Sequence, residues 1–360
     1  MRNSNKILLI SIILISIFGI IMIYSASHIW ANYKYNDSLK YVKNQTLFFI
    51  VGLFLLYFFS KLNYKWYYNN SNKILFVCYI LLILVLIPGI GSIRNGSRSW
   101  FGIGPFGIQP SEAAKLALII FTSKHLSNNE NEIKNVKKGV LPVLALTFII
   151  FFTIMLQPDF GTGTILVMSI IGLLFVGGVS VKFFLKIGLV GLMGVVGLIL
   201  IAPYRLSRIL SFIDPWKDPL GSGFQIIQSM YAIGPGGLFG MGFGNSIQKH
   251  FYLPEPQTDF IFSIISEEFG FMGVIIVVTL FLIIIVSCFN ICLKSNNLFS
   301  KYLAFGITFQ FSFQAILNLM VVVGLIPVTG VTLPFLSYGG SSLLISMSSM
   351  GILLNIGKYN

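Results

Sequence analysis

The sequence predicts an all-α protein that crosses a membrane several times, and three observations support this. Of its 360 residues, 56% are apolar and only 10% are charged. Apolar runs recur from end to end, and ~20 apolar residues in a helix span the hydrocarbon of a bilayer. Backbone groups in lipid must be satisfied within their own segment, so these runs should be helices. No Ser- or Pro-rich linker divides the chain, so we expect one integral membrane domain over residues 1–360.

Ten apolar runs are candidate membrane helices. The first follows Arg2 and Lys6, and its apolar stretch from Ile7 to Ile23 exceeds a typical signal-peptide core, which favours a membrane helix. Connections with polar, Gly or Pro residues separate the others. The expected spans are residues 7–27, 45–60, 74–90, 112–126, 140–156, 163–179, 183–202, 259–289, 302–326 and 333–356.

The charge distribution predicts how these spans are oriented. The net charge is +13, and outside the longest connection most basic residues share one side, which places both termini in the cytoplasm. The basic residues are dispersed without an aromatic-interleaved patch, which argues against nucleic-acid binding and favours contacts with anionic lipids. The three cysteines lie in apolar runs and match no metal-ligand or disulfide spacing.

The outer side should carry the chemistry, because only Glu130 and Glu132 among the acidic residues fall on the inner side. The longest outer connection covers about 203–258, between the seventh and eighth spans. Long connections in compact proteins are usually functional or disordered. Within it, Phe224, Ile227, Met230 and Tyr231 recur at helical spacing opposite Gln225, Gln228 and Ser229, which predicts a short amphipathic helix at the membrane surface.

Two carboxylates, Glu255 and Asp259, lie four residues apart where this connection enters the eighth span. Charges at a bilayer edge are costly, so they usually face a cavity or take part in chemistry. The alternative is helix capping by Thr258 or Asp259. Because capping needs one of the two acids, we favour a functional role for the pair.

Other charged residues gather at the outer mouths of the spans. Glu112 and Lys115 are three residues apart and share a helix face, either as an internal ion pair or with Lys115 facing a polar cavity, and Ser111 is a candidate N-cap. Arg94 and Arg98 precede Trp100 in a glycine-rich loop, a pattern that suits either phosphate binding or membrane anchoring.

Three further segments carry candidate residues. Asp159 lies in a short outer turn, and its position there is best explained as marking a turn and the start of a helix. Glu267 and Glu268 fall inside the eighth span and are expected to pair with buried cations or amides. Ser341 belongs to a run of small residues that either packs helices closely or leaves room for a lipid tail or headgroup.

Ten short segments along the chain carry a recognisable pattern: residues 19–27, 96–100, 109–115, 157–162, 218–223, 228–229, 233–237, 253–262, 324–330 and 334–342. Taken together and in this order, these segments resemble the SEDS family of membrane glycosyltransferases, which comprises FtsW, RodA and SpoVE, and the sequence around residues 212–217 and 254–259 is closer to FtsW and SpoVE. Where family members often have Arg before the Gln that opens the second span, this chain has Asn44 before Gln45, with Lys43 as a stand-in.

The resemblance implies a peptidoglycan glycosyltransferase that polymerises lipid II at the outer face of the bacterial plasma membrane, for division or spore and septal wall synthesis. It also implies ten membrane helices, a class B penicillin-binding protein as partner together with divisome-type membrane proteins, and an essential acid at Asp259. For an inverting transfer that releases undecaprenyl diphosphate, one base suffices, since the diphosphate leaves without a proton.

We therefore expect Asp259 to be the base and Glu255 its helper, with Arg98 and Lys115 steadying the diphosphate. No cofactor is certain, although Mg²⁺ or Mn²⁺ could share the charge neutralisation. The remaining candidate substrate-binding residues are Glu112, Arg94, Trp100, Asp159 and Ser341.

Two other classes of protein fit the same composition. A transporter, such as a lipid II flippase, should place its key charges near the bilayer midplane and show repeated halves, whereas here the charges lie at the outer edge and no repeat is visible. A scaffold that only recruits a transpeptidase should tolerate the loss of Asp259 and Arg98.

Overall fold

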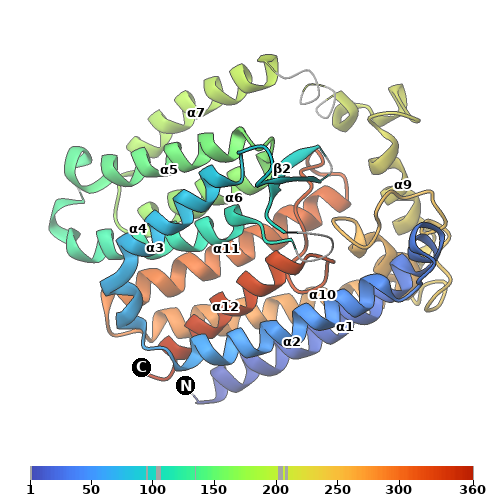
Figure 1. The fold of residues 1–360 in the computed structure, drawn as a ribbon, viewed down its shortest axis with the longest axis horizontal. Coiled ribbons are helices and arrows are strands. Elements are labelled where there is room, and N and C mark those ends of the chain that lie inside the picture. Colours follow the sequence, from blue (N-terminus) through green and yellow to red (C-terminus); the bar gives the residue numbers. More distant parts are fainter. Residues whose placement is uncertain are drawn as a thin grey trace.

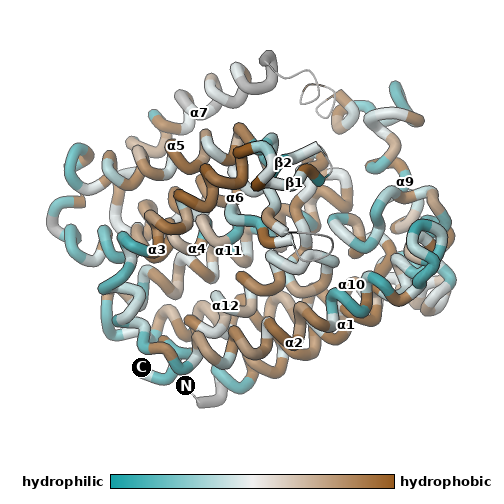
Figure 2. The backbone as a smooth tube through the Cα atoms, viewed as in Figure 1, coloured by the Kyte–Doolittle hydropathy of each residue, from teal (hydrophilic) through white to brown (hydrophobic). Residues whose placement is uncertain are grey.

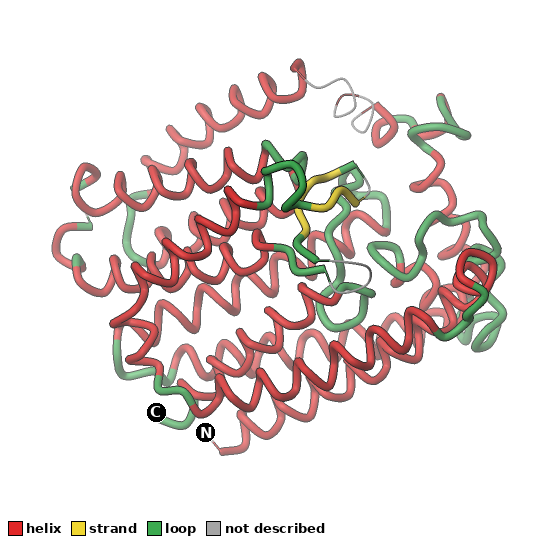
Figure 3. The backbone as a smooth tube through the Cα atoms, in the orientation of Figure 1, coloured by secondary structure: helices red, strands yellow, loops and turns green. Residues whose placement is uncertain are grey.

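A computed structural model describes residues 2–94, 96–102, 107–133, 135–201, 206 and 210–359. Its helices form a bundle in which both chain termini lie at one end, while the two strands and the long connections lie at the other (Figures 1 and 3). Asn5 near the N-terminus donates a hydrogen bond to the carbonyl of Leu354 near the C-terminus, which ties the two ends of the chain together. All the sequence-predicted site residues lie toward the opposite end.

The part of the chain that the structure describes places a helix at each of the ten predicted spans. Short 3₁₀ turns at Glu130–Glu132, Pro215–Lys217 and Gly234–Gly236 and a π turn at Val136–Val140 complete the regular structure. The elements are α1 (Arg2–Tyr35), α2 (Lys40–Lys61), α3 (Tyr64–Leu84), β1 (Ser92–Arg94), β2 (Ser97–Trp100), α4 (Pro110–Asn128), α5 (Leu141–Met155), α6 (Phe160–Val176), α7 (Val181–Ile201), α9 (Phe224–Ile233), α10 (Ile261–Leu293), α11 (Leu298–Val322) and α12 (Gly340–Ile356).

Five of the described helical segments are long and apolar enough to cross a membrane: α1, α2, the π turn with α5, α10 and α11. Helices α6 and α12 are apolar but shorter. Many large apolar side chains point outward, such as Phe54 and Phe76, and hydrophobic residues dominate the middle parts of the helices, with hydrophilic residues at helix ends and connections (Figure 2). Such a surface would aggregate in water but suits lipid. The all-α membrane fold is thus confirmed, whereas the number of crossings stays a prediction.

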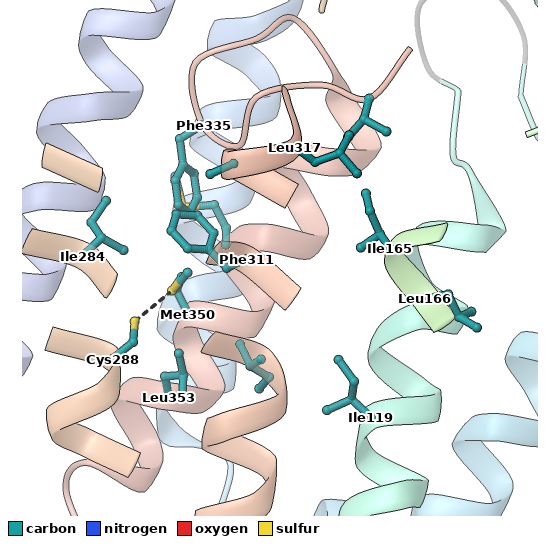
Figure 4. Close-up of a cluster of buried hydrophobic side chains, with 14 of the residues drawn as sticks. Ile119, Ile165, Leu166, Ile284, Cys288, Phe311, Leu317, Phe335, Met350 and Leu353 are labelled. Atoms are coloured by element: carbon teal, nitrogen blue, oxygen red, sulfur yellow. Dashed lines mark hydrogen bonds between the residues drawn. The ribbon is translucent and has the colours of Figure 1, made fainter. Parts of the chain in front are cut away.

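Helix α11 lies at the centre of the bundle and packs against α4, α6, α10 and α12, while α2 packs against α12 and α1 against α10. Figure 4 shows part of the apolar core, where Phe311 of α11 lies between Phe335 and Met350, and Ile119 of α4 and Ile165 of α6 lie opposite. Interlocking of these side chains fixes the polar residues that α11 carries toward the end of the bundle opposite the termini.

The predicted N-cap Ser111 is wrong, and the less favoured alternative of capping by Thr258 or Asp259 is not observed at α10. Helix α4 begins at Pro110 with Gln109 as N-cap, because proline is preorganised for the first helical position and needs no acceptor for an N–H. Helix α10 begins at Ile261 with Phe260 as N-cap, so neither Thr258 nor Asp259 caps it. The carboxylate of Asp259 therefore has no capping role at that helix.

The predicted short amphipathic helix of the long outer connection is present as α9, and Ser229 of its predicted polar face is buried in the bundle. Met230 and Tyr231 are exposed, whereas Ser229 is fully buried and donates to the carbonyl of Val322 over 2.7 Å. The reason is that α9 packs against α10 and α11, and small residues permit this close approach.

Helix α10 is interrupted at Gly270, whose φ of 62° is the left-handed conformation that favours glycine. The chain at residues 237–242 docks against this interruption: Met241 and Gly242 donate to the carbonyls of Glu267 and Glu268 over 2.9 and 3.0 Å, and Phe271 donates to Gly237 over 2.9 Å. The outer connection is thereby held to α10 by backbone hydrogen bonds.

Replacing Gly270 by Ala should lower the free energy of unfolding by about 2–5 kcal/mol, the sum of left-handed backbone strain and overpacking. A Cβ at this position would lie 2.4 Å from the amide nitrogen of Gly240. Denaturant unfolding of the protein in detergent measures the loss. Gly191→Ala in α7, where a Cβ meets nothing within 4 Å, is the matched control and should be neutral or stabilising. Equal stability of the two variants would contradict the docked arrangement.

Candidate active site

The segment from Glu255 to Asp259 forms a tight turn just before α10. Glu255 has a left-handed φ of 44°, and its carbonyl accepts the N–H of Thr258 over 3.0 Å. The Thr258 hydroxyl lies 2.8 Å from Oδ1 of Asp259. Asn318 of α11 donates to the carbonyls of Asp259 and Val331 over 2.8 and 2.7 Å. The turn therefore presents two half-buried carboxyl side chains from a backbone that α11 holds in place.

Tyr338 connects this turn to the connection between α11 and α12. Its N–H donates to the carbonyl of Gln257 over 2.8 Å, and its ring packs edge-on against Tyr41 of α2 at 4.9 Å. Gln45, one of the residues that carries the family resemblance, donates to Ser337 and accepts from Gly339. Burial raises the pKa of Tyr338, while the nearby Asn44 amide and the positive charge of Arg94 oppose this shift. Glu255 also interacts electrostatically with Tyr41.

Strands β1 and β2 form an antiparallel hairpin that the sequence did not predict, and the hairpin separates the two arginines. The Arg94 guanidinium lies 5.1 Å from the ring centre of Trp100 and interacts electrostatically with Tyr338. The Arg98 guanidinium instead donates to the carbonyl of Leu86 over 3.5 Å. Of the two cations, Arg94 is thus the one placed toward Tyr338 and the carboxylate turn.

Gln109, just before α4, brings two further candidates together. Its N–H donates to the Ser341 hydroxyl over 2.9 Å, and its amide group donates to Asp159 over 2.8 Å. Ser341 in turn donates to the carbonyl of Gly107 over 2.8 Å. Asp159 caps α6 by accepting the N–H of Thr162, which confirms its expected helix-start role. Both predicted residues are fixed by the start of α4.

Glu112 and Lys115 form a buried ion pair with a separation of 2.9 Å. The Lys115 side chain is only 1% exposed, and its ammonium also donates to Gln314 of α11 over 3.3 Å. Asp159 interacts electrostatically with both members of the pair. Of the two interpretations that the sequence allowed for Glu112 and Lys115, the structure shows the internal ion pair. Through Gln314, the pair joins α4 to α11.

A small cavity opens beside this pair, between α4, α11 and α12. Its polar lining comes from Glu112, Gln310, Gln314, Ser346 and Ser349, and it has room for water over about 20 Å³. One water needs ~10–15 Å³ of such space and two to four polar partners. The cavity next to the charged pair therefore has room for about one water molecule, with polar groups on one part of its lining.

The predicted residues fall into two connected groups. The first joins Glu112, Lys115, Asp159 and Ser341 through Gln109, and the second places Glu255 and Asp259 next to Tyr338. Arg94, over Trp100, lies close to both Tyr338 and Gly107, and so between the groups. Arg98 is turned toward α3.

Several residues of this end were missed by sequence reasoning, namely Gln314, Asn318, Tyr338 and Lys249. One signal could have revealed Lys249. Two adjacent acids inside an apolar span, Glu267 and Glu268, need compensation from another segment, and the long outer connection contains few cations. The structure confirms that the acids are paired, because Lys249 lies 2.9 Å from Glu268. The uncharged residues gave no such signal.

Comparison with known proteins supports the family resemblance noted in the sequence. A family model for FtsW, RodA and SpoVE, described as cell cycle protein, matches residues 5–360. Stage V sporulation protein E of Bacillus subtilis is 51% identical over 100% of this chain and 98% of its own length. The probable peptidoglycan glycosyltransferase FtsW of Trichlorobacter lovleyi is 42% identical over 98% of this chain and 92% of that protein.

Solved structures agree with these relatives. A chain of a peptidoglycan synthase complex that couples polymerisation and crosslinking has a TM-score of 0.79 at 30% identity, covering 98% of this chain and 97% of its own. The rod shape determining protein RodA of Thermus thermophilus has a TM-score of 0.72 at 27% identity over 98% of this chain and 95% of that protein. The chain is a multi-pass membrane protein, and it belongs to the FtsW, RodA and SpoVE family.

Proposed function

We propose that this chain is a peptidoglycan glycosyltransferase that polymerises lipid II into glycan strands at the outer face of the plasma membrane. Its relatives in the FtsW group carry that enzymatic name, and its similarity to the sporulation protein favours a role in division or in spore and septal wall synthesis. The observation that carries the proposal is the pinned turn that presents Glu255 and Asp259 at the end of the bundle opposite the termini.

In the proposed reaction the 4-hydroxyl of an acceptor sugar attacks the anomeric carbon of the donor. A bond forms between that oxygen and the anomeric carbon, while the bond from the carbon to the undecaprenyl diphosphate oxygen breaks. The diphosphate departs with the electron pair, and the hydroxyl proton passes to the Asp259 carboxylate, so the anomeric configuration inverts. Glu255, four residues earlier in the same turn, positions the acceptor or supports the base.

Developing charge on the diphosphate calls for fixed cations. Arg94 suits this role because its planar guanidinium lies over Trp100 and close to Tyr338, which is bonded to the carboxylate turn. Lys115 acts from a buried position, where Glu112 and Gln314 hold its ammonium. Asp159 and Ser341 position these cationic segments through Gln109.

Arg94→Gln should lower kcat/KM for lipid II about tenfold to a hundredfold, because a charge-assisted hydrogen bond contributes about 1.5–3 kcal/mol. Initial rates of polymerisation at varied lipid II concentration measure this. Arg98→Gln removes a guanidinium that is bonded to Leu86 and should have a smaller effect on kcat/KM. A larger effect from Arg98→Gln would indicate that Arg98, and not Arg94, contacts the diphosphate.

A divalent cation has a limited set of ligands at this site. Among the described residues no group of three or more His, Cys, Asp or Glu side chains could hold a metal. Mg²⁺ commonly takes one or two carboxylates together with substrate phosphates. Glu255 would therefore be its protein ligand beside the substrate, where the metal would supply charge neutralisation for the diphosphate, while Asp259 keeps the role of base.

A class B penicillin-binding protein is the proposed partner, since the peptidoglycan synthase complex with a similar chain couples polymerisation to crosslinking. Divisome-type membrane proteins are proposed as further partners. We place both termini in the cytoplasm, which fits their position at one end of the bundle and the charge bias of the sequence.

The test is turnover of purified lipid II by the purified protein in detergent, with and without its penicillin-binding partner. Formation of glycan polymer supports the enzyme, because detergent abolishes membrane sidedness and leaves no compartment for transport. Lipid II that is bound but never polymerised, under conditions where the partnered complex is intact, would instead favour a flippase.

A further inference from the structure

Three charged side chains outside the candidate active site are almost completely buried: Lys249 at 2% exposed, Glu267 at 1% and Glu268 at 0%. Lys249 belongs to the long outer connection, and the two acids lie in α10 just before its interruption at Gly270. A charge is removed from water at high cost unless it is paired and hydrogen-bonded. The proposed reaction uses none of the three, so their burial needs another explanation.

The polar contacts of the cluster involve three separate parts of the chain. The Lys249 ammonium donates to Glu268 over 2.9 Å, to the carbonyl of Gly244 over 2.5 Å and to the Ser25 hydroxyl over 3.3 Å. The Ser25 hydroxyl, from α1, lies 2.7 Å from the other carboxylate oxygen of Glu268. Lys249 thus joins the outer connection to α10 and to α1 at a single point.

Glu267 holds the neighbouring residues of the same connection. Its carboxylate accepts the Ser246 hydroxyl over 2.6 Å and the N–H of Ile247 over 2.7 Å. The backbone of Gly240 also packs tightly here, since a Cβ at Gly240 would lie 2.2 Å from the carbonyl oxygen of Glu268. The connection from 240 to 249 is therefore fixed against α10 by both side-chain and backbone contacts.

The fixed segment leads directly to the carboxylate turn. Phe251, with a left-handed φ of 66°, packs against Trp30 and Tyr33 of α1 at 5.5 and 5.3 Å between ring centres. Leu253 is buried and donates its N–H to Gln248 over 2.9 Å. Glu255 follows two residues later. The turn thus lies between two anchors, the Lys249 cluster before it and Asn318 after it.

We propose that Lys249 is a positioning residue, which sets the location of the Glu255–Asp259 turn by joining the outer connection to Glu268 of α10 and Ser25 of α1. The inference rests on the proposed function for its activity readout only. Polar clusters of this kind specify one arrangement of a structure more than they add to its stability. It follows that α1, which carries none of the candidate catalytic residues, controls how the two carboxylates are presented.

The test compares Lys249→Met with the double variant Lys249→Met/Glu268→Gln. The single variant leaves Glu268 buried without its cation and should give less folded protein. The double variant removes both charges and should restore folding. We expect its kcat for lipid II polymerisation to fall at least tenfold, with KM within about threefold of wild type, because the groups proposed to bind the diphosphate are elsewhere. Lys217→Met, an exposed cation of the same connection, is the matched control and should behave as wild type.

Hydrogen–deuterium exchange provides a readout that does not depend on catalysis. The amides of Ile247, Leu253 and Thr258 are hydrogen-bonded, and in the double variant peptides covering 246–259 should exchange faster while those of α11 and α12 are unchanged. A double variant with wild-type kcat, or with unchanged exchange over 246–259, would overturn the positioning role. If the wild-type protein does not polymerise lipid II, the proposed function fails, and the exchange result still decides whether Lys249 anchors the turn.

Discussion

Replacing Asp259 by Asn should reduce the kcat of lipid II polymerisation by about 10²–10⁴-fold, the usual contribution of a general base. Asn has nearly the same shape, and the structural contact from Asn318 is made to the backbone carbonyl of Asp259, so the turn should stay in place. The loss would then report the missing carboxylate. Single-turnover rates of the purified protein with its penicillin-binding partner measure it directly.

A matched variant separates this effect from a general loss of acidic charge. Asp37→Asn removes a carboxylate from the connection between α1 and α2, where Asp37 pairs with the exposed Lys43 at 2.9 Å. Solvent screens exposed pairs of this kind and they contribute little to stability, so this variant should polymerise lipid II normally. Asp259→Asn with a near-normal rate would remove Asp259 from the role of base, whatever the behaviour of Asp37→Asn.

Breaking the Glu112–Lys115 pair should have the largest effect on stability. Lys115→Met leaves Glu112 buried without its cation, and removal of one partner of a buried pair typically costs about 3–5 kcal/mol. The variant should unfold at markedly lower denaturant concentration and lose polymerase activity with it. Chemical denaturation in detergent, followed by the yield of monodisperse protein, measures the change.

The double variant Lys115→Met/Glu112→Gln tests whether the pair also acts on substrate. Both charges are gone, so stability should recover most of its loss. If Lys115 helps to neutralise the diphosphate, the recovered protein will still have a low kcat. Full recovery of both stability and kcat would show that the pair only links α4 to α11 and does not act on the substrate.

The helices could be predicted from the sequence because apolar run length is a strong local signal. Each predicted span overlaps a described helix, although α3 covers Tyr64–Leu84 where 74–90 was predicted and α12 begins at Gly340 where 333 was predicted, and α9 was found from its periodicity alone. The burial of Ser229, on the predicted polar face of α9, was not predicted, because it follows from packing against α10 and α11, which no local pattern records. The hairpin at Arg94 and Arg98 is likewise too short to give a strand signal.

The candidate site was predictable where charge is unusual in an apolar chain. Glu112, Lys115, Glu255 and Asp259 were identified for that reason, and the pairing of Glu112 with Lys115 followed from helical spacing. Asn318 and Tyr338 act through backbone contacts to residues far away in sequence, and amides and tyrosines are ordinary in such segments. Which of the two arginines turns toward Tyr338 depends on the register of the hairpin.

The interruption of α10 at Gly270 also bears on which amino acids that helix tolerates. The 24 residues from Gly270 to Leu293 rise about 36 Å at 1.5 Å per residue, which by itself exceeds the ~30 Å hydrocarbon layer. The nine residues before the break are thus not needed to span the hydrocarbon layer. This explains how Ser263, Ser266, Glu267 and Glu268 can occupy a segment whose continuation from residue 274 to 286 is almost wholly aliphatic. The reason why polar substitutions are excluded along α10 should therefore change at Gly270: before it, residues such as Ile264 and Ile265 are limited by burial inside the protein, whereas beyond it exposed positions such as Ile276 are limited by contact with lipid.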